Sequence, residues 1–255
     1  MNRILFSLIL FANLWIWRIT SYNFFLGTLV ILCAVFLYAC IQNESDRKYS
    51  KVLIILFILL TFFQWRTTER ASLTVLTNSD IQVRDMRLNE YPPVKISLAG
   101  KTVWIPIAHW FEGRVESIAF FRLLRNFSEV IDPNLYFFAN HPRERVGVSE
   151  FEKFPYLLLP FFIYGLVTII SKHKFKKELV ISFFIPLILV AIIGGKNSLS
   201  IFSLFPFVFT MSVHGLNRVW DIVSKKHKTH RKQIASGFLI IYFLVLIQQI
   251  SYVVH

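Results

Sequence analysis

Long hydrophobic runs fill both ends of the chain, and one polar stretch separates them. About 20 apolar residues, with roughly 17 as a lower limit, are needed to cross a membrane as a helix. We therefore predict seven transmembrane helices, whose approximate bounds are 3–19, 22–41, 51–65, 155–171, 179–195, 201–216 and 234–253. The third and sixth runs are short, so a re-entrant segment is the alternative for one of them.

The polar stretch carries most of the acidic residues and contains no apolar run of membrane length. It divides the chain into three N-terminal transmembrane helices (1–65), a loop domain (66–154) and four C-terminal transmembrane helices (155–255). The predicted fold class is an all-α polytopic membrane protein with about seven transmembrane helices. Its loop domain is predicted to be mixed and extracytoplasmic, and to contain an interfacial helix.

Two kinds of local structure are predicted inside the loop domain. Residues 71–77 and 94–98 alternate between apolar and polar side chains and contain β-branched residues, and Gly100 is a typical turn residue. We therefore expect a short strand pair or an irregular cap over 66–104. Residues 114–131 place apolar side chains at helical spacing and are expected to form a helix lying flat on the outer membrane surface. Asp132-Pro133-Asn134 should end this helix.

The composition agrees with a membrane location. Of the 255 residues, 55% are hydrophobic and 27 are Phe, whereas soluble domains are roughly 45–50% apolar. Cys33 and Cys40 lie seven residues apart in one apolar run, about 10 Å along a helix, which is too far for a disulfide. They therefore give no information about the redox compartment.

Basic residues in the short links predict the orientation of the chain, because cytoplasmic links are enriched in Lys and Arg. With the N-terminus in the cytoplasm, the loop domain 66–154 and the C-terminus face outside, in a protein integral to the cytoplasmic membrane. The positive residues expected on the cytoplasmic side are Arg3, Arg47, Lys48, Lys51, Lys172, Lys174, Lys176, Lys177, Arg218, Lys225, Lys226, Lys228, Arg231 and Lys232.

The net charge of +13 is concentrated on these links. The charges meet anionic lipid head groups there, so we predict membrane lipids and not nucleic acid as their partner. The densest patch consists of Lys225, Lys226, Lys228, Arg231 and Lys232. His227 and His230 within it have no cysteine partner at a metal-ligand spacing, so no metal site is predicted. No motif for a cofactor is present either.

Several short motifs after residue 115, in a particular order, resemble one family. They are Asn126-Phe127-Ser128, Asp132-Pro133-Asn134-Leu135-Tyr136-Phe137-Phe138, His141-Pro142-Arg143, Pro160 with Gly165, Pro186, Phe205-Pro206 and His214-Gly215-Leu216. This stretch, roughly 115–216, resembles the later part of GT-C membrane glycosyltransferases. In that family an interfacial helix leads to an F-S-P-x-F-L-F-F segment, an N-P-R-H turn and an L-P-F-L-L-L-G-L helix.

The resemblance implies a polytopic protein that uses a sugar carried on a polyprenyl phosphate at the outer face of the membrane. The family's catalytic carboxylate lies just after its first span, where this chain has Ile19-Thr20-Ser21-Tyr22-Asn23 and no acid. Glu144 also stands in place of the final histidine of the family's turn. These departures imply a shortened, non-catalytic relative or one that depends on a partner subunit.

Two groups of residues in the loop domain are candidates for chemistry. Asp80, Asp85 and Glu90 are candidate general bases for a sugar-acceptor hydroxyl, although their mixture with Arg84 and Arg87 equally suits a solvated surface. His141, Arg143 and Arg145 are candidates for binding a lipid phosphate, because arginine forks suit phosphate oxygens. The alternative for this second group is anchoring of the loop or pairing with Glu144 and Glu150.

The function predicted first is a partner-dependent or non-catalytic GT-C-like subunit, a scaffold at the outer face of the membrane. Its candidate partners are a lipid-linked sugar and another membrane subunit. The first alternative is a minimal glycosyltransferase that uses a polyprenyl-phosphate-linked sugar and an acid of the loop domain. The second alternative is an accessory subunit of an unrelated membrane complex.

Overall fold

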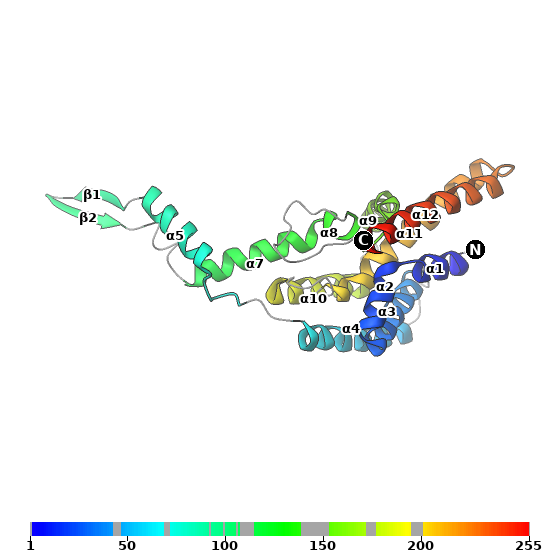
Figure 1. The fold of residues 1–255 in the computed structure, drawn as a ribbon, viewed down its shortest axis with the longest axis horizontal. Coiled ribbons are helices and arrows are strands. Elements are labelled where there is room, and N and C mark those ends of the chain that lie inside the picture. The colour runs from blue at the N-terminus through cyan, green and yellow to red at the C-terminus, as the bar shows by residue number, and fades with distance from the viewer. Residues whose placement is uncertain are drawn as a thin grey trace.

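The computed structural model of the chain is mostly helical and elongated (Figure 1). It describes residues 2–42, 47–68, 72–91, 93–98, 100–105, 107, 115–138, 153–171, 177–194 and 201–254. The helices are α1 Asn2–Phe11, α2 Leu14–Tyr22, α3 Phe24–Gln42, α4 Arg47–Thr67, α5 Asn78–Glu90, α7 Val115–Ile131, α8 Asn134–Phe137, α9 Leu159–Ser171, α10 Lys177–Ile193, α11 Phe205–Lys226 and α12 Arg231–Val254. Two 3₁₀ turns, η1 Tyr156–Leu158 and η2 Phe202–Leu204, lead into α9 and α11.

Several helices of the chain are long and apolar enough to cross a membrane. Within the described residues three helical stretches qualify, namely Phe24–Gln42, Tyr49–Thr67 and Arg231–Ser251. The third predicted span, 51–65, is therefore part of a longer helix, α4. A fourth span arises if α1 and α2 count together. The predicted number of seven and the orientation stay predictions.

The first predicted span, 3–19, is two helices that meet at an angle of 58°. Asn13 lies at the break with extended backbone dihedrals (φ −97°, ψ 121°). Its side-chain oxygen accepts hydrogen bonds from the backbone N–H groups of Trp15 (2.9 Å) and Ile16 (3.2 Å). This is an N-cap, which satisfies amides that a new helix leaves open, so Asn13 begins α2 where a continuous helix was expected.

Helix α11 lies at the centre of the helical bundle. Every residue from Phe205 to Asn217 is buried, and α9 packs against this half of the helix more extensively than any other element does. The close approach occurs at two glycines: a Cβ added to Gly165 would collide with the Met211 carbonyl, and one added to Gly215 with the Phe161 carbonyl. Small residues of this kind allow helix backbones to approach closely in membranes.

Polar side chains connect other helices of the bundle. The Asn217 amide of α11 donates to the Tyr38 hydroxyl of α3 at 2.8 Å. The Gln64 side-chain oxygen of α4 accepts from the Ser203 amide of η2 at 3.0 Å. Both contacts are buried, and buried polar groups need such partners, so they help to fix the order of α3, α4 and α11.

The predicted helix over 114–131 is α7, and Asp132-Pro133 ends it as expected. One side of α7 packs along α10, and its Asn126 amide donates to the Ala191 carbonyl at 3.0 Å. In Figure 1 the two helices run side by side. A neighbouring helix, in addition to any membrane surface, therefore covers α7.

Residues 66–104 differ from the extended region that the sequence suggested. A helix, α5, occupies Asn78–Glu90, and the described residues between 72 and 77 contain no strand. Thr77 and Asp80 explain the helix, because the Asp80 amide donates to the Thr77 hydroxyl (3.3 Å) and the Asp80 carboxylate accepts from the Thr77 amide (2.9 Å). This reciprocal pair is a capping box with Asp in the usual Glu position.

A short strand pair, as expected within 66–104, is present further along, and it joins the predicted segment 94–98 to the residues after Gly100. Strand β1 (Val94–Leu98) pairs antiparallel with β2 (Lys101–Ile105), and Val94 lies opposite Ile105. Gly100 lies in the turn with φ +78°, a conformation that glycine adopts at little cost. We call α5, β1 and β2 together the arm. Figure 1 shows the hairpin at one end of the long axis, far from the bundle that holds both termini.

Candidate functional site

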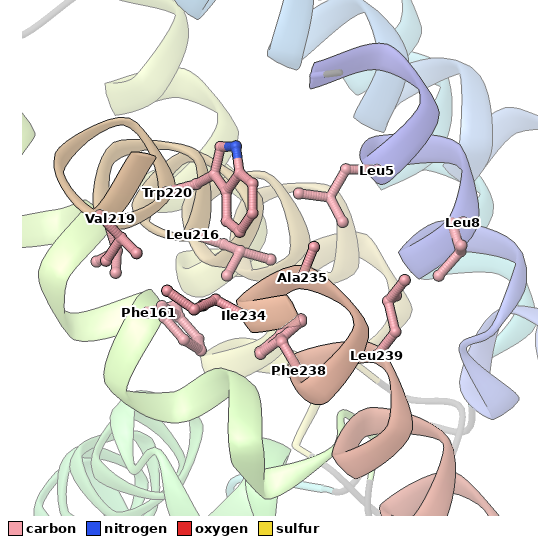
Figure 2. A pocket seen from close by; sticks show the side chains of 11 residues that line it. Leu5, Leu8, Phe161, Leu216, Val219, Trp220, Ile234, Ala235, Phe238 and Leu239 are labelled. Carbon is pink, nitrogen blue, oxygen red and sulfur yellow. The ribbon is translucent and has the colours of Figure 1, made fainter. Parts of the chain in front are cut away.

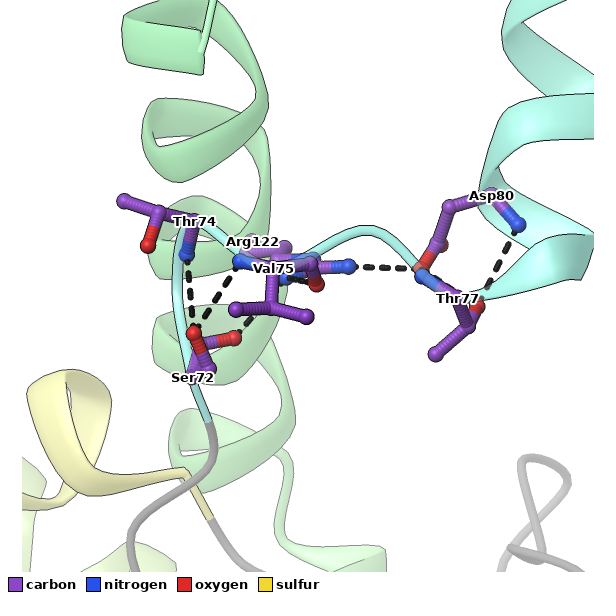
Figure 3. Close-up of polar contacts among 6 residues, drawn as sticks. All are labelled: Ser72, Thr74, Val75, Thr77, Asp80 and Arg122. Atoms are coloured by element: carbon purple, nitrogen blue, oxygen red, sulfur yellow. Dashed lines mark hydrogen bonds and ion pairs between the residues drawn. The ribbon is translucent and has the colours of Figure 1, made fainter.

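Arg122 of α7 contacts the chain that leads into the arm. The Arg122 guanidinium donates to the Ser72 carbonyl (2.8 Å), the Val75 carbonyl (2.6 Å) and the Asp80 carboxylate (2.5 Å). Figure 3 shows how these groups surround the arginine between α7 and the start of α5. Because one planar group contacts three positions on the incoming chain, it fixes where α5 begins relative to α7.

Asp80, one of the predicted general bases, takes part in this contact through one carboxylate oxygen. Its carboxylate accepts hydrogen bonds from the Thr77 hydroxyl, the Thr77 amide and Arg122. The Thr77 hydrogen bonds, followed by the nearby Arg122 charge, hold the pKa of Asp80 below its ordinary value of 3.8. A carboxylate stabilised in its charged form is a weaker base, so the geometry gives Asp80 a role in holding the arm.

The other two predicted acids have different surroundings. Asp85 pairs with the neighbouring Arg84 at 2.8 Å, and its side chain is 53% exposed. Glu90 lies exposed in the last turn of α5. Five residues turn a helix by about 140°, so Asp80, Asp85 and Glu90 point in three directions around α5. The structure does not bring them to one shared cleft.

The predicted phosphate-binding residues His141, Arg143 and Arg145 lie outside the described residues, as do Glu144 and Glu150. The structure describes both flanks of this segment. The backbone carbonyl of Tyr136 accepts from the amides of Lys153 (3.1 Å) and Phe154 (2.8 Å). The chain therefore enters the segment at the end of α8 and leaves it beside the same helix.

Lys153 and Asn13 are buried at this crossing, and sequence reasoning missed both. Asn13 donates from its side chain to the Lys153 carbonyl at 3.0 Å, and the Lys153 ammonium donates to the Leu135 carbonyl at 2.9 Å. Asn13 is 0% exposed and Lys153 is 2% exposed. A buried asparagine or lysine is unusual, but neither is recognisable from sequence because their partners are 140 and 18 residues away.

An aromatic cluster surrounds this crossing. Trp15 of α2 contacts the rings of Phe154 and Phe205 at centroid distances of 5.7 and 5.4 Å. Phe154 also contacts Phe137 of α8 (5.8 Å) and Phe205 (5.1 Å). These rings are fully buried, and aromatic pairs at such distances stabilise packing beyond the area that they bury. The cluster joins α2, α8 and α11.

One face of the hairpin is mostly apolar. Residues paired across the two strands share a face, so Val94 and Ile105 lie on the same face as Ile96 and Val103, with Lys101 on that face at the turn end. On the opposite face the Lys95 ammonium lies over the Trp104 ring at 4.3 Å, beside the polar pair Ser97 and Thr102. We call Val94, Ile96, Val103 and Ile105 the apolar face of the hairpin.

The described residues contain no group of three or more His, Cys, Asp and Glu that could hold a metal ion. The predicted lipid-contacting residues, which are Lys225, Lys226, Lys228, Arg231 and Lys232, are all exposed where α11 ends and α12 begins. Cys33 and Cys40 are buried and unbridged.

Comparison with known proteins adds no relative: no family model, no characterised protein and no solved structure matches the chain.

Proposed function

We propose that this protein is a membrane-embedded, non-catalytic subunit that presents its arm to a partner protein at the outer face of the membrane. In this proposal the helical bundle anchors the subunit, α7 supports the arm, and the hairpin makes the contact. It is the partner-dependent form of the GT-C-like protein that the motifs between residues 115 and 216 resemble.

The uncovered apolar face of the hairpin carries this proposal. In the isolated chain Val94, Ile96 and Val103 are 47%, 37% and 48% exposed. A two-stranded hairpin is only marginally stable in water, and a hydrophobic face usually needs a third strand or a packed helix. A hairpin with one uncovered apolar face is therefore expected to gain stability when another surface covers it.

The attachment of the arm supports a role in binding. The Arg122 side chain is only 12% exposed, and it contacts two positions just before the arm and one in the first turn of α5. Such a contact limits the directions in which α5 can point. Pre-organisation of this kind reduces the entropy that an interface loses on binding.

A protein fits the hairpin better than a lipid surface. Each strand has one hydrogen-bonded neighbour among the described residues, so both outer edges can accept an added strand from another chain. The arm carries three acids and four bases, so its net charge is only +1, which gives little attraction to anionic membranes. We therefore expect a partner with an apolar surface and an open strand edge.

The positions of the acids favour the non-catalytic form over the minimal glycosyltransferase. Asp80 is held by Thr77 and Arg122, Asp85 pairs with its neighbour, and Glu90 lies in a third direction. Retaining the transferase alternative would require an acid from another part of the chain or from the partner.

Site-specific photo-crosslinking in the membranes of the cells that naturally make the protein tests the proposal. A photoreactive residue at Val103 lies on the apolar face, and the same residue at Thr102 lies on the opposite face of the same strand. We expect one protein adduct from position 103 and much less from position 102, and we expect Arg122→Ala to reduce the adduct. Equal adducts from both positions, or adducts with lipid alone, would contradict the proposal.

A further inference from the structure

A pocket opens at the end of the bundle that lies away from the arm. It has a volume of about 330 Å³ and is enclosed by side chains from α1, α9, α11 and α12 (Figure 2). Roughly 300 Å³ is the lower end of the range for ligand pockets in proteins. The lining is apolar except for the indole of one tryptophan, and the residues are Leu5, Leu8, Phe161, Leu216, Val219, Trp220, Val223, Ile234, Ala235, Phe238 and Leu239.

Helix α12 explains why space remains here. Only 22% of the residues in its apolar window are buried, compared with 50% for α3. Ile240, Leu244 and Ile247 are 61%, 60% and 62% exposed. Helix α12 therefore meets the rest of the bundle loosely, and apolar side chains face both the pocket and the surroundings of the helix.

Positive charge lies at one end of the pocket. Lys226 follows the lining residue Val223 by three positions, and Arg231 precedes Ile234 and Ala235 by three and four. Residues three or four apart share a helix face, so both cations lie on the sides of α11 and α12 that form the pocket. The Arg231 guanidinium also lies over the Trp220 ring at 5.7 Å.

Two buried donors at the same end lack an acceptor. Trp220 Nε1 and Ser224 Oγ lie one turn apart on α11, and neither has a hydrogen-bond partner among the residues that the structure describes. Buried polar atoms are nearly always hydrogen-bonded. Both atoms are closed off from the pocket, whose lining exposes almost no polar surface, so the recognition of a ligand here depends on the apolar lining and the two cations.

We propose that this pocket binds the acyl chain of one anionic phospholipid, whose phosphate lies between Lys226 and Arg231. The apolar lining takes the chain, and the two cations neutralise the phosphate. The basic links predict that this end faces the cytoplasm, where the leaflet is anionic. The site is distinct from the arm and does not depend on the partner proposed for it.

Native mass spectrometry of the detergent-purified full-length chain measures this binding directly. Phosphatidylglycerol and phosphatidylcholine with the same acyl chains are added separately. We expect one phosphatidylglycerol to remain bound after most detergent is removed, and phosphatidylcholine to bind at least about tenfold more weakly, because each Lys or Arg near the head group contributes about a fivefold preference.

Two pairs of variants locate the site. Ala235→Phe places a ring in the pocket and leaves every charge unchanged, whereas Gly237→Phe lies on the same helix at a position with open space around it. Lys226→Gln with Arg231→Gln removes the two cations, whereas Arg47→Gln with Lys51→Gln removes two from another basic link. We expect the first member of each pair to lose the bound lipid about tenfold or more, and the second to retain it.

Three results would overturn the proposal. The first is equal binding of both phospholipids, and the second is retention of phosphatidylglycerol by Ala235→Phe at the unchanged level, which would place the chain elsewhere. The third is equal loss from both pairs of charge variants, which would indicate a diffuse response to charge. The thermal unfolding of Ala235→Phe and of Gly237→Phe is compared with that of the unaltered chain, so that lipid loss is judged only in folded protein.

Discussion

Gly165 of α9 and Gly215 of α11 face each other where the two helices cross. A Cβ built on Gly165 lies 3.2 Å from the Gly215 amide nitrogen, and one built on Gly215 lies 2.8 Å from the Gly165 amide nitrogen. Backbone therefore contacts backbone at this crossing, with no space for even a methyl group on either side. Helix α11 is the most buried helix of the bundle. These two glycines therefore set how closely α9 can approach it.

Replacement of Gly215 by alanine should separate the two helices. The new methyl group meets the Phe161 carbonyl, which is backbone and cannot rotate away. Overpacking of a well-packed core costs about 1–3 kcal/mol. We expect a lower midpoint of thermal unfolding in detergent for Gly215→Ala and also for Gly165→Ala.

Gly237 provides the matched control for this prediction. It is also a helical glycine, but a Cβ added there meets nothing within 4 Å. Gly237→Ala should leave the midpoint unchanged or raise it, because alanine has the higher helix propensity by about 1 kcal/mol. Equal destabilisation of all three variants would contradict the packing argument.

Replacement of Arg122 by alanine should release the arm while leaving the bundle folded. The change removes the donor to Ser72, Val75 and Asp80. The Asp80 side chain is about one-third exposed, so solvent reduces the value of the ion pair, and we expect a cost of roughly 1–2 kcal/mol. Hydrogen exchange of the α5 amides should become several-fold faster, while exchange in α3 and α11 stays unchanged.

Arg125 is the control for the release of the arm. It lies one turn along α7, it is 55% exposed in its side chain, and its contact with Glu129 is 3.9 Å long. Arg125→Ala should therefore leave α5 exchange at the unaltered rate. Faster exchange in both variants would mean that the positive charge of α7, and not the specific contact, holds α5.

The attachment of the arm should weaken in acid. The pKa of Asp80 is lower in the folded protein than its ordinary value of 3.8, through the Thr77 hydrogen bonds and then Arg122. Unfolding of the contact therefore takes up a proton, so its stability is complete above about pH 3.8 and is lost as pH falls through the lowered value. We expect α5 exchange, corrected for its intrinsic pH dependence, to increase over that window. The increase should be absent in Asp80→Asn, which has no charge to lose.

Replacement of Asn13 by alanine should destabilise the crossing at Lys153. The change removes two hydrogen bonds that cap α2 and one to the Lys153 carbonyl. Loss of an N-cap alone costs about 0.5–2 kcal/mol, and the Lys153 carbonyl also loses the Asn13 donor. We expect a lower midpoint of thermal unfolding and faster proteolysis next to Lys153.

A variant at Asn23 separates the effect of losing a helix cap from the effect of losing the bond to the Lys153 carbonyl. Its side chain caps α3 by accepting from the Leu26 amide at 3.1 Å, and it lies exposed. Asn23→Ala should show the loss of a cap without a change in proteolysis near Lys153. If both variants change the proteolysis pattern equally, the long-range bond from Asn13 has no separate effect.

Local sequence signals predicted the elements whose causes lie within a few residues. Helix α7 follows from its apolar spacing, and Asp132-Pro133 ends it because proline cannot continue a helix. The hairpin turn follows from Gly100, which adopts a positive φ. Helix α5 was missed because the β-branched residues before it favoured an extended region, and the cap formed by Thr77 and Asp80 was not considered. The break at Asn13 was missed because an asparagine inside a long apolar run also fits a continuous helix.

The candidate site was predicted less well than the elements. Asp80, Asp85 and Glu90 are close in sequence, but helix geometry separates them, and the Arg122 partner of Asp80 is 42 residues away. Lys153 has no distinctive sequence signal, since a lysine beside a polar loop is ordinarily exposed. The pocket combines residues from four helices, and no local pattern joins Leu5 to Phe161 and Ala235.

The sequence by itself predicted a membrane location, because its apolar runs exceed what one soluble core can bury. It also determined which links carry the positive charge and where α7 ends. The tertiary structure decided which glycines meet, which acid holds the arm, and which helices leave a pocket between them. Contacts between distant residues depend on how helices cross and rotate against one another, and hydrophobic periodicity specifies only which residues share a face.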